Sequence, residues 1–169
     1  GPDRPPPPYL TGRLADRLTP ARQGFQVGLV WSGRTESRHQ KGRALDLGSL
    51  APVLAELPGI AFYSLQLGEA AGQLAGWPGP ALPVDRSGEM TDFAATATIL
   101  SGLDLLITVD TAAAHLAGAL GRPAFVLLPA LSHWVWGLER ETTDWYPALR
   151  LFRADEGGWD RALGKLSQA

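Results

Sequence analysis

Residues 104–129, DLLITVDTAAAHLAGALGRPAFVLLP, decide the fold class of this chain. The apolar, partly β-branched run over 105–109 predicts a strand buried on both faces. Asp110 and Thr111 then turn the chain, and either side chain can cap the helix that follows. That helix is rich in alanine and glycine, so its backbone can pack closely on a strand, and residues 124–128 predict the next strand. Strand, helix and strand in this order indicate an α/β unit.

The same alternation extends over most of the sequence. Apolar runs predict further strands over 26–31, 60–66, 81–84 and 149–152, and helical spacing predicts helices over 47–57 and 92–100. We therefore expect a Rossmann-like parallel sheet of about six strands with helices on both faces. This domain is expected to span 25–169, after a Pro-rich tether and short helix over 1–24.

Composition excludes several classes of function. A formal net charge of −2 gives no general attraction to nucleic acid or to an anionic membrane. The chain has no cysteine and three histidines, so we expect no metal site, and no apolar run is long enough to cross a membrane. A cytoplasmic protein is favoured.

The turn after 105–109 is the first candidate site. In open α/β sheets ligands bind at the carboxyl ends of the strands, and the free amide groups of Thr111, Ala112 and Ala113 at a helix amino end attract phosphate. The alternative is that Asp110 and Thr111 serve only as a helix cap. His115, one turn further on, is either a ligand or a packed, hydrogen-bonded residue.

The loop after the first strand is the second candidate. It has neither the three-glycine dinucleotide pattern nor a Walker pattern. Within ten residues it carries Glu36 and five basic or potentially basic side chains: Arg34, Arg38, His39, Lys41 and Arg43. The loop is either a solvated surface or a source of cations for a diphosphate held between it and the turn at Asp110.

Four segments carry a resemblance to a known family. VGLVWSG, LPGIAFYSLQLGE, MTDFAATATILSGLDLLITVDTAAAHLAGALGRP and WYPALRLFR resemble the carboxyl-terminal half of glycosyltransferase family nine, the heptosyltransferase-like group, in the variant fused to tetratricopeptide repeats. The resemblance covers about 26–153. It implies one lobe of a two-lobed GT-B architecture, the lobe that binds a nucleotide sugar. The missing amino-terminal lobe would supply acceptor contacts and the catalytic base, so no catalytic residue is expected in this chain.

The resemblance also implies how the diphosphate and sugar are held. It places the donor diphosphate against the backbone of Thr111, Ala112 and Ala113, with Asp110 contacting the sugar or holding the turn and His115 in support. The basic phosphate ligand is Lys41 or Arg43. Arg43 fits the family's Arg-Ser pattern better, although Ala44 stands where the family has serine.

The nucleoside contacts implied by the resemblance lie in two other segments. An acidic residue for the ribose is expected after the second strand, where Glu69 is the first choice and Gln66 lies in the same stretch. The nucleobase is expected at the segment of Met90 and Asp92. Met90 and the neighbouring Phe93 are equally well explained as packing residues.

The tryptophans have both functional and structural interpretations. Trp134 and Trp136 resemble the family's aromatic cap over the sugar, or they mark an exposed contact with the missing lobe. Trp145 and Tyr146 are expected to pin the chain where it re-enters the sheet, and Trp159 is expected to anchor the last helix.

Two functions from different classes remain. One is the donor-binding lobe of a sugar transferase, inactive alone, with a nucleoside-diphosphate sugar as substrate and no separate cofactor. Because the sequence has no Asp-x-Asp pair, its own cations are expected to replace a metal ion at the diphosphate. The alternative is a non-catalytic nucleotide-binding or partner-docking module of a repeat protein.

Overall fold

The computed structural model describes residues 10, 24–33 and 45–169 of the chain. The basic loop with Lys41 and Arg43 lies outside the described residues, as does the Pro-rich segment apart from Leu10. In chain order, the elements are β1 (Phe25–Val30), α1 (Leu47–Leu54), β2 (Ile60–Ser64), η2 (Glu69–Gly76), β3 (Val84–Asp85), η3 (Ser87–Glu89), α2 (Phe93–Gly102), β4 (Leu105–Val109), α3 (Ala112–Ala119), β5 (Ala124–Leu128), η4 (Trp134–Trp136), β6 (Leu149–Arg153) and α4 (Asp160–Leu166).

The strands form one parallel sheet in the order β3-β2-β1-β4-β5-β6. This arrangement confirms the predicted α/β, Rossmann-like class. In β1, Val27 is paired with Phe62 of β2 on one side and with Leu105 of β4 on the other. The chain adds strands outwards from β1 to β3 and then, in the opposite direction, from β4 to β6. The order therefore reverses between β1 and β4.

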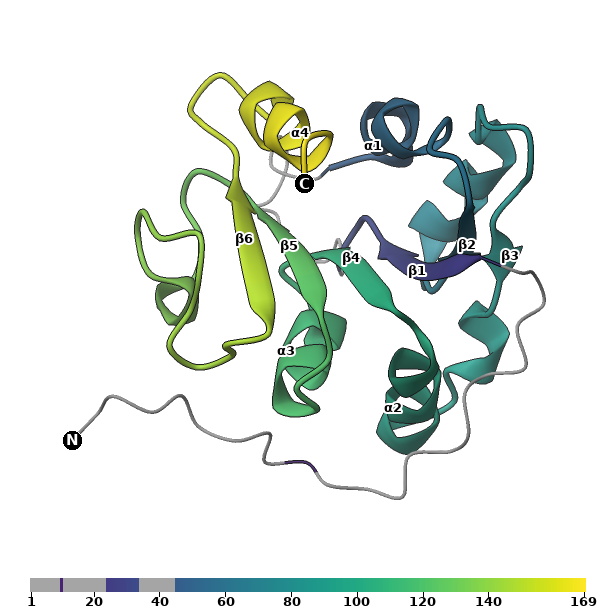
Figure 1. Cartoon of the computed structure of the whole chain (residues 1–169), viewed down its shortest axis with the longest axis horizontal. Helices are drawn as coiled ribbons and strands as arrows, with labels where there is room; N and C mark the ends of the chain where they lie inside the picture. Colours follow the sequence, from purple (N-terminus) through teal and green to yellow (C-terminus); the bar gives the residue numbers. More distant parts are fainter. Residues whose placement is uncertain (1–9, 11–23, 34–44) are drawn as a thin grey trace.

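Helices cover both faces of the sheet, α1 and α4 on one and α2 and α3 on the other (Figure 1). The first face buries a core around Leu29, Trp31 and Leu50, and the second buries a core that includes Leu106 and Leu116. Burial on both faces explains why the central strands read as nearly continuous apolar runs rather than as alternating ones.

The boundaries of the elements differ from the predicted ones where local signals conflict. The predicted bounds of β4 and β5 are confirmed. The strand expected over 81–84 is wrong in extent, because β3 holds only Val84 and Asp85. Pro83 immediately precedes it and has no amide hydrogen to donate to a ladder. The acidic cap of α2 is confirmed, since the Asp92 carboxylate accepts a hydrogen bond from the Ala95 amide at 2.7 Å.

Over the described ranges, every helix is too short or too polar to cross a membrane. The same residues contain no cluster of three or more histidine, cysteine, aspartate or glutamate side chains placed to hold a metal ion.

Candidate functional site

The carboxyl ends of β1 and β4 meet at the point where the strand order reverses. The chain runs on from β1 to Gly33, where an added Cβ atom would lie 3.8 Å from the backbone oxygen of Asp110 and 3.8 Å from Cγ2 of Thr111. The loop after β1 therefore starts beside the turn after β4. Open α/β sheets bind their ligands in the crevice at such a point, so the turn and the start of the loop define the candidate site.

The amino end of α3 carries backbone donors that find no acceptor in the described part of the chain. Thr111 occupies the cap position, but its hydroxyl lies 2.9 Å from that of Thr108 and makes no hydrogen bond to the helix. The first backbone bonds of the helix come from Ala114 and His115 to the Thr111 oxygen. No described residue accepts from the amides of Ala112 and Ala113. These two groups, with the positive end of the helix dipole, form a place where a phosphate oxygen can be held.

His115 links Asp110 to an aromatic cluster. Its Nε2 lies 3.7 Å from the Asp110 carboxylate, and its Nδ1 lies 3.2 Å from the Tyr146 hydroxyl. The imidazole also stacks at 4.8 Å, between ring centroids, on the buried Trp136. His115 is therefore a packed, hydrogen-bonded residue that still reaches the carboxylate beside the helix amino end.

The contact between Tyr146 and α3 depends on a glycine. A Cβ atom on Gly118 would collide with the ring of Tyr146, so only a glycine lets the tyrosine lie directly on the helix backbone. This close approach puts the Tyr146 hydroxyl beside His115, one turn earlier on the helix. This packing agrees with the prediction that Tyr146 pins the chain where it re-enters the sheet, whereas Trp145, for which the same was predicted, is 51% exposed.

A cavity of about 520 Å³ opens beside the turn. Asp110 and His115 line it from α3 and the turn, and Trp134, Trp145 and Tyr146 line it from the connection between β5 and β6. Trp134 is 70% exposed, which agrees with its predicted surface position. The expectation that Trp136 is also exposed is wrong, because its side chain is fully buried against the second core. Polar groups at one side and aromatic rings at the other suit a ligand with both hydroxyl groups and apolar faces.

Gln66 holds the loops after β1 and β2 together. Its side-chain oxygen accepts from the amides of Trp31 and Ser32, and its nitrogen donates to the carbonyls of Ser32 and Leu67, each at 2.9 Å. The residue is 2% exposed. Gln66 thus positions the strand ends that border the site, while its contact with a ribose stays a prediction.

The other predicted nucleoside residues lie at the carboxyl ends of β2 and β3. Glu69 is exposed at the start of η2, and Asp92 is exposed at the cap of α2. Met90 is half-buried and packs on the second core, whereas Phe93 is 69% exposed. Their roles in binding a nucleoside stay predictions, as do those of Lys41 and Arg43, which lie outside the described residues.

Comparison with known proteins gives one distant relative. The chain is 28% identical over 174 residues to "Protein FlbA" of Caulobacter vibrioides. The match covers 97% of this chain and 28% of FlbA, so the chain spans little more than a quarter of the length of that relative. No family model and no solved structure matches the chain.

Arg153 is an important residue that the sequence did not single out. From the end of β6 it donates to the Ser132 hydroxyl at 2.6 Å and to the carbonyls of Trp136 and Gly137 at 2.5 and 2.9 Å. These bonds fix the segment 130–138 (the β5–β6 loop), which contributes Trp134 to the cavity beside Asp110. A lone arginine at the end of a strand gives no sequence signal for such a role.

Proposed function

We propose that this chain is the donor-binding lobe of a sugar transferase whose substrate is a nucleoside-diphosphate sugar. The observation that carries the proposal is the amino end of α3, where the amides of Ala112 and Ala113 find no acceptor among the described residues. These donors lie at the reversal of strand order and beside Gly33, from which the basic loop departs. The donor diphosphate lies there, at the amino end of the helix.

The chemistry of this lobe is electrostatic. Sugar transfer breaks the bond between the anomeric carbon and a diphosphate oxygen, and negative charge develops on the leaving diphosphate. Backbone amides at a helix end, together with Lys41 or Arg43, stabilise that charge in place of a metal ion. A base on a second lobe removes the proton of the acceptor hydroxyl. These 169 residues alone are therefore expected to bind the donor but not to transfer its sugar, and turnover by this chain alone would contradict the assignment.

The donor sugar occupies the cavity lined by Asp110, Trp134 and Trp145. The Asp110 carboxylate is half-exposed and accepts no hydrogen bond from α3, so it is available to a sugar hydroxyl. The faces of the two indole rings, which meet edge to face with centroids 6.1 Å apart, suit the apolar face of a sugar ring.

Ligand-induced stabilisation tests the proposal. A ligand that binds only the native state raises the melting temperature by mass action. We expect one of ADP, GDP or UDP, with its sugar conjugates, to raise the Tm in a concentration-dependent way. The absence of a shift with every nucleotide would refute a donor-binding lobe.

Asp110→Asn then separates the sugar contact from a structural role. The side chain of Asp110 does not cap α3, and its contact with His115 is long and partly exposed, so the change should alter stability by only a few tenths of a kcal/mol. We expect weaker binding of the nucleotide sugar and unchanged binding of the bare nucleoside diphosphate, which lacks the sugar. If Asp110→Asn weakens the binding of both ligands equally, Asp110 does not contact the sugar.

One observation favours the second candidate, a partner-docking module. Four large apolar side chains are exposed in the connection between β5 and β6: Leu131, Trp134, Leu138 and Trp145. Exposed apolar groups gathered in one segment are typical of contact surfaces. Indifference to all nucleotides in the thermal-shift experiment would favour this function.

A further inference from the structure

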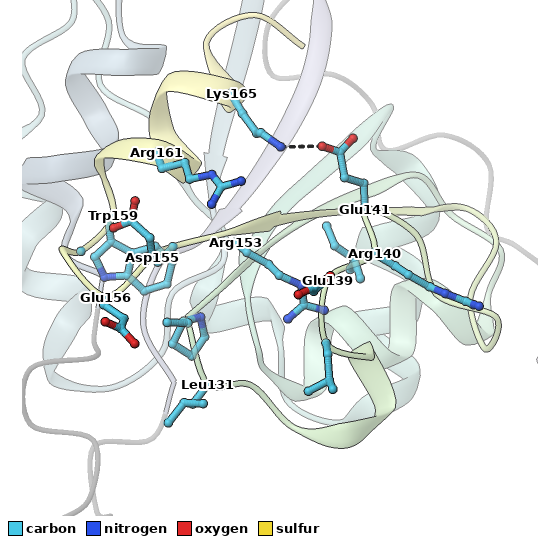
Figure 2. Close-up of a pocket in the computed structure, with 16 residues that line it drawn as sticks. Leu131, Glu139, Arg140, Glu141, Arg153, Asp155, Glu156, Trp159, Arg161 and Lys165 are labelled. Carbon is cyan, nitrogen blue, oxygen red and sulfur yellow. Dashed lines mark hydrogen bonds and ion pairs between the residues drawn. The ribbon is translucent and has the colours of Figure 1, made fainter.

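A second and larger cavity lies beside the edge strand β6. Its volume is about 890 Å³, within the range of small-molecule sites, and Figure 2 shows its lining side chains. The β5–β6 loop stands between the two cavities: Trp134 lines the cavity beside Asp110, while Leu131 and Leu138 line this one. We call it the β6 cavity. Its lining includes four basic and four acidic side chains.

Arg153 brings an uncompensated positive charge to this cavity. Its guanidinium is held by one hydroxyl and two carbonyl groups, all neutral, and no described carboxylate lies within ion-pair distance of it. Its Nε is buried and has no acceptor among the described residues. Partial burial lowers the pKa of Arg153, which is the mark of a cation whose lost hydration is not replaced by a counter-charge.

Three more charged side chains line the β6 cavity without neutralising one another. Arg161, on α4, forms no ion pair with any described carboxylate, although its charge helps to lower the pKa of Glu141. Among the described residues, the Asp155 carboxylate accepts only from the Gly157 amide, at 2.9 Å, and no described cation pairs with it or with Glu156. Figure 2 shows Asp155 and Glu156 beside the indole of Trp159, with Arg161 and Arg153 nearer the middle of the cavity.

The positive and negative side chains of the β6 cavity favour a ligand that carries both charges over one that carries a single charge. A simple anion attracted by Arg153 and Arg161 is repelled by Asp155 and Glu156, and a simple cation meets the opposite problem. A molecule with one group of each sign satisfies both ends at once, and each of its charges offsets part of the desolvation of the other. Leu131 and Trp159 also line the cavity and give such a molecule an apolar surface.

We propose that the β6 cavity binds a small zwitterionic molecule, with its carboxylate or phosphate group toward Arg161 and Arg153 and its amine toward Asp155 and Glu156. The proposal is independent of the donor site, because none of these residues lines the cavity beside Asp110.

Amide chemical shifts provide the direct test, with ε-aminocaproate as the probe. It carries an amine and a carboxylate on an apolar chain, and caproate and n-hexylamine each carry one of those charges. We expect ε-aminocaproate to shift residues of β6, α4 and the β5–β6 loop at millimolar concentration, and each single-charge compound to bind at least several-fold more weakly. If the single-charge compounds shift these residues equally well, or if ε-aminocaproate shifts none of them, the proposal is wrong.

Single substitutions test which residues hold the carboxylate and the amine of ε-aminocaproate. Arg161→Gln and Glu156→Gln should each weaken ε-aminocaproate binding about threefold to fivefold, as expected for exposed ion pairs. Arg140→Gln is the control, because Arg140 also lines the cavity but is already paired with Asp144 at 2.7 Å. It should bind the probe like the parent.

If Arg161→Gln, Glu156→Gln and Arg140→Gln all bind ε-aminocaproate with the same affinity, the assignment of its two charged ends to Arg161 and Glu156 is wrong. Nucleoside-diphosphate binding, measured on the same proteins, should be unchanged throughout. If ε-aminocaproate does not bind, only the zwitterion proposal fails. If the parent protein binds no nucleoside diphosphate, only the donor-site proposal fails.

Discussion

Replacing Gln66 with methionine tests whether this buried amide organises the border of the candidate site. Methionine has a similar length and flexibility but no hydrogen-bonding amide. Gln66→Met removes four hydrogen bonds of 2.9 Å and leaves the buried amides of Trp31 and Ser32 without an acceptor. A buried donor without a partner costs ~1–3 kcal/mol, so the loss of the acceptor for these two amides should lower the free energy of unfolding by ~2–6 kcal/mol. That is a large part of the ~5–15 kcal/mol typical of a domain.

The matched control is the same substitution at Gln73. Its side chain is exposed and accepts one hydrogen bond, from the Leu47 amide at 2.8 Å. Gln73→Met should therefore cost only ~0.5–1.5 kcal/mol. Urea unfolding of the two variants and the parent measures both losses. Similar losses for Gln66→Met and Gln73→Met would refute the argument that Gln66 holds the two loops together.

Three further changes have defined outcomes. Gly118→Ala should lower the free energy of unfolding by ~1–3 kcal/mol, because the added methyl displaces the ring of Tyr146, and near-UV circular dichroism should report the altered aromatic packing. Asp92→Ala should cost ~0.5–2 kcal/mol by removing the cap of α2, whereas Asp92→Ser should restore most of that loss; failure of serine to do so would argue against a capping role. Lys165→Met should raise the pKa of Glu141, which the hydrogen bond and charge of Lys165 now hold below its ordinary value, and an NMR titration that finds no change would contradict this cause.

The sequence predicted the elements whose signals are local. The strands β4 and β5 are five-residue apolar runs between polar or turn residues, and both were found at their expected bounds. The turn at Asp110 could be placed because it follows such a run. Its capping could not, because the Thr111 hydroxyl bonds instead to Thr108, which only the folded turn brings near.

The contacts within the site that escaped prediction join positions that are distant in the sequence. Gln66 bonds to residues 34 and 35 positions earlier, and Tyr146 meets a histidine 31 positions before it. Nothing in the composition around Trp136 distinguishes an exposed indole from the fully buried one that the structure contains. Residue type alone therefore predicted a turn at the carboxyl end of β4, but not which side chains contact one another around it.

The place of Arg153 in the chain has a consequence for the order in which the molecule is assembled. Arg153 belongs to the last strand, yet it donates hydrogen bonds to the carbonyls of Trp136 and Gly137, which come earlier and lie in the β5–β6 loop, other residues of which line both cavities. The corner formed by Gly33, β4 and α3 needs no residue from β6. As the chain emerges from the ribosome, amino end first, that corner can be built before β6 exists. The β5–β6 loop, which contributes to both cavities, acquires its hydrogen bonds to Arg153 only when residue 153 has been added to the chain.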